Sequence, residues 1–156
     1  MAITRRNVLA GAAVAGGLPL AQYNLCMPAF AADDDVVLGP PVKDQPIQKL
    51  SPHIYMVEAP DGFPTPENQG LMSNIVFIVG KEGVIVIDSG ASLQIARMSI
   101  RQLQTVTKAP VIGVFNTHYH GDHWLGNHGF VEAYGKEIPI YAMAGTRTAI
   151  EGGTGT

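Results

Sequence analysis

The chain has 156 residues, of which 46% are apolar and 15% charged, and its formal net charge is −3. This balance is typical of a globular protein of about one domain and excludes an intrinsically disordered chain. Lysine and arginine form no basic block, so the charge pattern typical of nucleic-acid-binding proteins is missing from the sequence.

The first 31 residues have the composition of an export leader. Arg5 and Arg6 precede an apolar run at 8–20, whose 13 residues fall short of the roughly 20 that span a bilayer. The paired arginines resemble a twin-arginine signal, and small residues predict cleavage after Ala31. We expect export machinery as a partner, a periplasmic or secreted mature protein and no stable membrane insertion; a retained signal anchor is the alternative. Cys26, the only cysteine, would leave with the leader, so no thiolate ligand would remain.

The segment after the leader is predicted to lead into the domain without forming part of it. Residues 32–52 are rich in Asp and Pro, which indicates an extended lead-in. Residues 53–59 have the β-branched and aromatic side chains of a short strand. Residues 60–73 form a long stretch of Pro, Gly and Asn, and loops of this length are usually functional or mobile. The domain is therefore expected to run from residue 53 to residue 156.

Two apolar runs follow, at residues 74–80 and 83–90, joined through Lys81 and Glu82. Their length and the short connection predict a β-hairpin. Both runs are almost continuously apolar, which favours strands that are covered on both faces of the sheet.

Residues 92–107 are predicted to form an amphipathic helix. Ser92 can cap its first turn, and Pro110 follows shortly after its last turn. Apolar residues three and four positions apart form one stripe that we expect to face the core: Leu93, Ala96, Ile100 and Leu103.

The remaining elements alternate between strand and helix. Residues 111–115 predict a buried strand, 124–135 a short helix or irregular turn, 138–143 a strand, and 144–151 the start of a helix. This order favours an α/β fold with a site at the carboxyl end of a strand. The last helix has barely begun where the chain stops, which indicates a truncated domain.

Four potential metal ligands lie within six positions directly after the strand predicted at 111–115: His118, His120, Asp122 and His123. If the strand continues, the imidazoles of His118 and His120 point the same way, because side chains two residues apart share one face of a strand. Gly121 then allows a bend that turns Asp122 and His123 back toward the same point.

Imidazole nitrogens and carboxylate oxygens bind Zn²⁺ at about 2.0–2.2 Å, and the same ligand atoms also bind iron or manganese. The alternative is a solvated polar turn. Three converging histidines would repel one another when protonated, and burial without a metal would leave polar atoms without partners. The cluster therefore predicts a metal site, a hypothesis that depends on the structural context.

The sequence "HYHGDH", with the strands "NIVFIV" and "GVIVIDSG" before it, resembles the metallo-β-lactamase fold superfamily over about residues 50–150. The resemblance implies an αββα sandwich of two similar halves, with a shared metal site at the edge where the halves meet. This chain would supply about the N-terminal half. Further ligands of that family come from later positions than this sequence contains.

Carried over to this chain, the resemblance assigns His118 and His120 to a first metal and Asp122 and His123 to a second. Asp88 would hold the ligand loop in place through hydrogen bonds. The alternative for Asp88 is a cap on the turn that follows its strand.

The resemblance also implies a reaction and a small-molecule substrate. Two zinc ions in a complete site would lower the pKa of a shared water from 15.7 toward about 7, and the hydroxide would attack a β-lactam, lactone or thioester carbonyl. Asp122 would orient that hydroxide and is the expected catalytic residue. The alternatives are an inactive metal-binding fragment and a sulfur-compound oxygenase on the same fold.

The long loop at residues 60–73 resembles the flap that covers the site in this family. Apolar side chains of the loop, together with the tryptophan after the cluster, are expected to line the substrate pocket, although local packing would explain them equally well: Phe63, Leu71, Met72 and Trp124.

Overall fold

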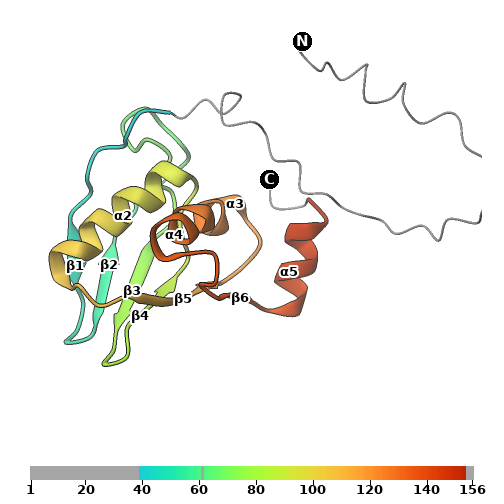
Figure 1. Ribbon diagram of the computed structural model, residues 1–156. Helices are drawn as coiled ribbons and strands as arrows, with labels where there is room; N and C mark the ends of the chain where they lie inside the picture. The colour runs from blue at the N-terminus through green and yellow to red at the C-terminus, as the bar shows by residue number, and fades with distance from the viewer. Residues whose placement is uncertain (1–38, 61, 154–156) are drawn as a thin grey trace, which may run out of the picture. The chain divides into compact units, whose positions relative to one another are not determined.

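The computed structural model describes residues 39–60 and 62–153 (Figure 1). The predicted leader, its cleavage site after Ala31 and the first part of the lead-in lie outside these residues, so those expectations stay predictions. Within the described ranges, no helix has the length and apolar character that a membrane crossing requires.

The described residues form one six-stranded mixed sheet in the order β1-β2-β3-β4-β5-β6. The first four strands pair antiparallel, whereas β4 pairs with β5, and β5 with β6, in parallel. The strands are β1 (Ile47–Lys49), β2 (Ile54–Val57), β3 (Ile75–Val79), β4 (Val84–Ile87), β5 (Val111–Asn116) and β6 (Ile140–Ala142). The helices are α2 (Leu93–Val106), α3 (Gly121–Trp124), α4 (Asn127–Tyr134) and α5 (Ala144–Glu151). The α/β prediction is confirmed.

The predicted lead-in contributes a strand, which the sequence did not indicate. Strand β1 pairs antiparallel with β2, so that Ile47 lies opposite Val57. Pairing satisfies the backbone N–H and C=O groups of this short segment, and Ile47 packs against the core. Three residues with a single apolar side chain are too few to produce a recognisable strand pattern.

Helix α2 forms as predicted and covers one face of the sheet together with α4 (Figure 1). The Ser92 side chain caps it by accepting a hydrogen bond from the Ile95 N–H at 3.2 Å. Ala96, Ile100 and Leu103 are buried as expected, whereas Leu93 is only partly buried.

Helix α4 approaches α2 closely because it carries Gly129 at their contact. A Cβ atom at Gly129 would lie 2.6 Å from the Cβ of Ala96. The close packing positions the segment that precedes α4, which contains the histidine cluster.

The other face of the sheet is open in the described residues, so the expectation of strands covered on both faces is wrong for this part of the chain. In β4 the side chains alternate, with Val84 and Val86 buried and Ile85 and Ile87 partly exposed. Further along this face, Phe115 is 39% exposed. A continuously apolar run indicates that both faces of its strand contact apolar groups. It does not identify the chain segment that covers each face. In an αββα sandwich a second sheet lies on such a face.

Candidate metal centre

The histidine cluster lies where β5 ends and α3 begins. Strand β5 stops at Asn116, and His120 occupies the position before the first residue of α3. The strand therefore does not continue through His118 and His120, so the condition under which their imidazoles would share one strand face is not met. The chain leaves the sheet because the N–H of Thr117 donates to the Asp88 carboxylate, at 2.8 Å, instead of to a neighbouring strand.

The side chains of the cluster nevertheless converge. Nε2 of His118 lies 3.1 Å from Nδ1 of His120, and the rings of His118 and His123 have centroids 3.9 Å apart. On the single turn of α3, Nε2 of His123 lies 3.2 Å from a carboxylate oxygen of Asp122. The four residues that the sequence predicted as ligands thus lie in one neighbourhood.

Asp88 makes the contacts that its predicted supporting role requires. The residue follows β4, is 5% exposed, and has a positive φ of 59°, a conformation that side-chain-bearing residues rarely adopt. One carboxylate oxygen accepts the N–H of Thr117. The other contacts the hydroxyl of Thr117 at 2.8 Å and Nδ1 of His123 at 2.7 Å. A strand-end aspartate therefore connects the end of β5 to α3.

The environment of His118 favours its neutral form. Burial lowers the pKa of the His118 imidazole, and positive charge on His123 and His120 would lower it further. A neutral imidazole has a free lone pair, and this is the form that binds a metal ion.

The backbone of α3 is held by polar side chains that the sequence pattern did not single out. The carbonyl oxygen of His123 accepts hydrogen bonds from the Ser89 N–H at 2.9 Å and from the Asn116 amide at 3.1 Å. The carbonyl oxygen of Asp122 accepts one from the Ser73 hydroxyl. All three donors are buried; Ser73 precedes an apolar run and Ser89 and Asn116 end one, which is the one feature by which the sequence could have indicated them.

The donors fit part of a metal site. Tetrahedral zinc with metal–nitrogen distances of about 2.0–2.1 Å requires donor atoms roughly 3.3–3.4 Å apart, close to the separation in the His118/His120 pair. Among the described residues, however, no group of three or more His, Cys, Asp or Glu is arranged to hold a metal ion. Zinc sites in proteins take three or four protein ligands. The described part of the chain therefore offers pairs of donors that need further ligands.

The predicted substrate pocket is not assembled. Phe63 is 88% exposed, because its loop turns on itself and Asn68 binds the Phe63 carbonyl oxygen at 3.0 Å. Leu71 is only 4% exposed and belongs to the core, and Met72 is partly buried. Trp124 instead lines a cavity of about 390 Å³.

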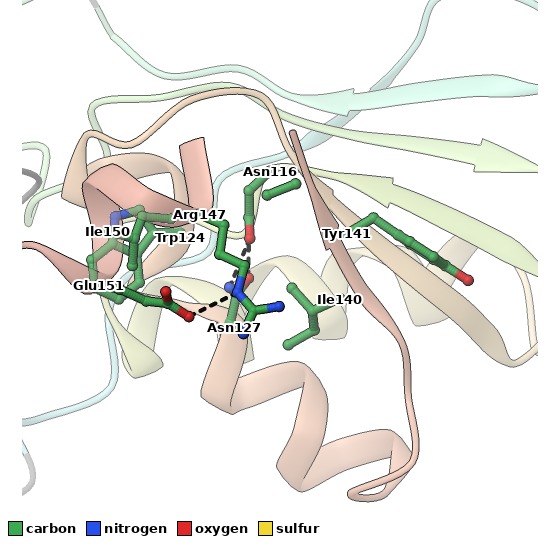
Figure 2. Close-up of a pocket in the computed structure, with 9 residues that line it drawn as sticks. Asn116, Trp124, Asn127, Ile140, Tyr141, Arg147, Ile150 and Glu151 are labelled. Carbon is green, nitrogen blue, oxygen red and sulfur yellow. Dashed lines mark hydrogen bonds and ion pairs between the residues drawn. The ribbon is translucent and has the colours of Figure 1, made fainter. Parts of the chain in front are cut away.

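This cavity lies against α5 and β6 (Figure 2). Asn116 and Asn127 also line it and bind each other, with the Asn127 amide donating to the Asn116 oxygen at 2.8 Å. Arg147 of α5 completes its polar lining together with Glu151, to which it is bound at 2.7 Å. None of the four predicted ligands lines this cavity.

The sequence matches the model of a known protein family. The model of the Metallo-beta-lactamase superfamily matches residues 68–148, just over half of the sequence. The chain belongs to this superfamily. The resemblance carried by the "HYHGDH" segment and the two strands before it is thereby confirmed, as is the partial match to the αββα fold.

Individual relatives of the superfamily match over limited regions. The chain is 31% identical over 69 residues to a linear primary-alkylsulfatase of a Pseudomonas species, covering 42% of this chain and 13% of that protein. Among solved structures it resembles a sec-alkylsulfatase of a Pseudomonas species (TM-score 0.53, 23% identity, 69% of this chain and 16% of the other). It also resembles the DIM-1 metallo-beta-lactamase (TM-score 0.54, 17% identity, 75% and 51%). The chain spans about half or less of the length of each. These structural likenesses concern the fold alone.

Proposed function

We propose that this chain is the N-terminal half of an exported, metal-dependent hydrolase and carries four of its metal ligands, with His118 and His120 holding one zinc ion and Asp122 and His123 a second. The observation that carries the proposal is the convergence of these four side chains at the end of β5, braced by the buried Asp88. Proteins of the metallo-beta-lactamase superfamily usually bind zinc, which supports zinc over iron or manganese.

A bound zinc ion would supply a hydroxide nucleophile at neutral pH, by lowering the pKa of a coordinated water to about 7. The residues of this chain would do the rest. His118 and His123 would offer imidazole nitrogens, and Asp122 a carboxylate that would accept a proton from the attacking water. The hydrogen bonds that hold the carbonyl groups of Asp122 and His123 keep these side chains in a fixed orientation.

We propose a small molecule with an electrophilic carbonyl, such as a β-lactam, lactone or thioester, as the substrate. The alkylsulfatase relative favours a second candidate, a sulfate ester. An inactive metal-binding fragment remains the alternative to either, since the described residues contain no group of three ligands. A sulfur-compound oxygenase would be distinguished by iron in place of zinc.

Zinc binding by the full chain tests the proposal. Isothermal titration with Zn²⁺, backed by elemental analysis of the purified chain, should show binding that His118→Ala and Asp122→Ala weaken at least tenfold. His128→Ala is the matched control, because His128 is an exposed histidine nearby to which no ligand role is assigned. Equal affinity in all four proteins would refute the assignment. Turnover of a β-lactam, a lactone, a thioester and an alkyl sulfate by the longest natural product of the gene would then define the substrate class.

Export is tested separately by fractionating cells that produce the chain. Lysine in place of both Arg5 and Arg6 should keep the chain in the cytoplasm if the leader uses the twin-arginine route. Unchanged periplasmic recovery of this variant would exclude that route.

A further inference from the structure

A chain of hydrogen bonds runs from the buried Asp88 to His118 through a residue with no assigned role, Thr117. The Thr117 hydroxyl lies 2.8 Å from one carboxylate oxygen of Asp88 and 3.0 Å from Nδ1 of His118. The Thr117 N–H binds the other oxygen of Asp88 at 2.8 Å, which fixes the position of the hydroxyl.

The number of protons decides the direction of each bond. An ionised carboxylate can only accept, so the single hydroxyl hydrogen of Thr117 points to Asp88. The hydroxyl oxygen is then left to accept, and its partner, Nδ1 of His118, carries the hydrogen. Neutral imidazole has only one N–H group, so Nε2 of His118 has the lone pair.

The lone pair of His118 is aimed into the cluster, since Nε2 is the atom that lies 3.1 Å from His120. The same Asp88 oxygen that receives the Thr117 hydroxyl also accepts from Nδ1 of His123, at 2.7 Å. One carboxylate thus contacts two histidines, His123 directly and His118 through Thr117.

We propose that Thr117 is a positioning residue that holds His118 in the tautomer whose Nε2 can bind a cation. Its effect on metal binding rests on the proposed function, whereas its effect on the tautomer is a property of the metal-free chain. Outer hydrogen bonds of this kind typically change metal affinity by about 10–100-fold.

The experiment compares hydroxyl-bearing and hydroxyl-free side chains at position 117 in the full chain. Thr117→Val removes the hydroxyl and keeps the shape, and Thr117→Ser keeps the hydroxyl. Thr105→Val is the matched control, because its hydroxyl binds the Gln102 carbonyl on the exposed side of α2. The ¹⁵N chemical shifts of the histidine rings without metal report the tautomer, and titration with Zn²⁺ reports affinity.

We expect the wild-type chain, Thr117→Ser and Thr105→Val to hold the hydrogen on Nδ1 of His118, and Thr117→Val to move it largely to Nε2. Zinc affinity should fall about 10–100-fold in Thr117→Val only. Thr117→Ala, a second hydroxyl-free variant, replaces valine if circular dichroism shows that valine unfolds the chain.

The outcomes separate the two proposals. An unchanged tautomer in the hydroxyl-free variants overturns the role of Thr117, and leaves the proposed function standing if the wild-type chain binds zinc. A changed tautomer with unchanged zinc affinity overturns the link between the two. A wild-type chain that binds no zinc removes the proposed function, and the tautomer measurement alone then decides the role of Thr117.

Discussion

Replacement of Asp88 by asparagine tests how strongly this one carboxylate holds the ligand loop. The amide oxygen of the new side chain can still accept the Thr117 N–H, but its NH₂ group cannot accept from the Thr117 hydroxyl or from His123. Asparagine tolerates the positive φ of this position, so the backbone is not disturbed.

The expected loss follows from the two bonds removed. A hydrogen bond to a charged group contributes about 1.5–3 kcal/mol, and two such bonds give about 3–6 kcal/mol. The side chain of His123 is 20% exposed and Thr117 is exposed, so water can replace part of what is lost. We therefore expect the free energy of unfolding to fall by about 3 kcal/mol, at the low end of the range, which corresponds to about 10 °C in Tm.

Urea unfolding of the full chain, followed by fluorescence, measures this change. Trp124 is the only tryptophan and directly follows His123, so its emission reports on the site. Asp44→Asn is the matched control. Asp44 also accepts two hydrogen bonds from one partner, Arg101, but its side chain is 55% exposed and such surface pairs contribute only about 0–1 kcal/mol. A loss below about 1 kcal/mol for Asp88→Asn, or an equal loss in the control, would refute the reasoning.

Four further predictions concern activity, pH, packing and association. Asp122→Asn should abolish turnover in the longest natural product while leaving its thermal unfolding unchanged; wild-type turnover would remove Asp122 from the mechanism. Because the pKa of His118 lies below its ordinary value of 6.5 in the folded chain, the unfolded chain binds more protons as pH falls through 6.5. Stability should therefore drop between pH 7.5 and pH 5 in urea titrations, and drop less in His118→Gln; parallel curves would contradict this. Gly129→Ala should lower the free energy of unfolding by about 1–3 kcal/mol, because the added methyl group meets Ala96 at 2.6 Å, and a neutral effect would show that α4 can move away. The open apolar sheet face should make the chain self-associate in light scattering, and Phe115→Lys should reduce this; a monodisperse wild-type monomer would speak against it.

Local patterns were sufficient for most elements of the fold. The hairpin of β3 and β4, the capped helix α2 and the strand β5 each have a periodicity or a turn that depends on neighbouring residues only. Strand β1 is too short to carry such a pattern, and its pairing partner β2 is what makes it a strand. Whether a sheet face is covered depends on which other layer packs against it, and the residues of one strand do not encode this. The apolar runs therefore predicted wrongly that the open face is covered.

The sequence by itself determined the chemistry of the candidate site, because the types of donor and their spacing, from His118 to His123, are written in one short segment. Only the tertiary structure decided which atoms of that segment face one another. Asp88 is 35 positions away from His123 and Ser73 is 49 positions away from Asp122, yet both contact the ligand loop. Contacts across such separations arise because β4 and β5 pair in parallel, and β3 pairs antiparallel to β4, so that the start of β3 and the ends of β4 and β5 lie at the same edge of the sheet. No local pattern of residues specifies these pairings, and it is these pairings that turn a run of histidines into an oriented set of donors.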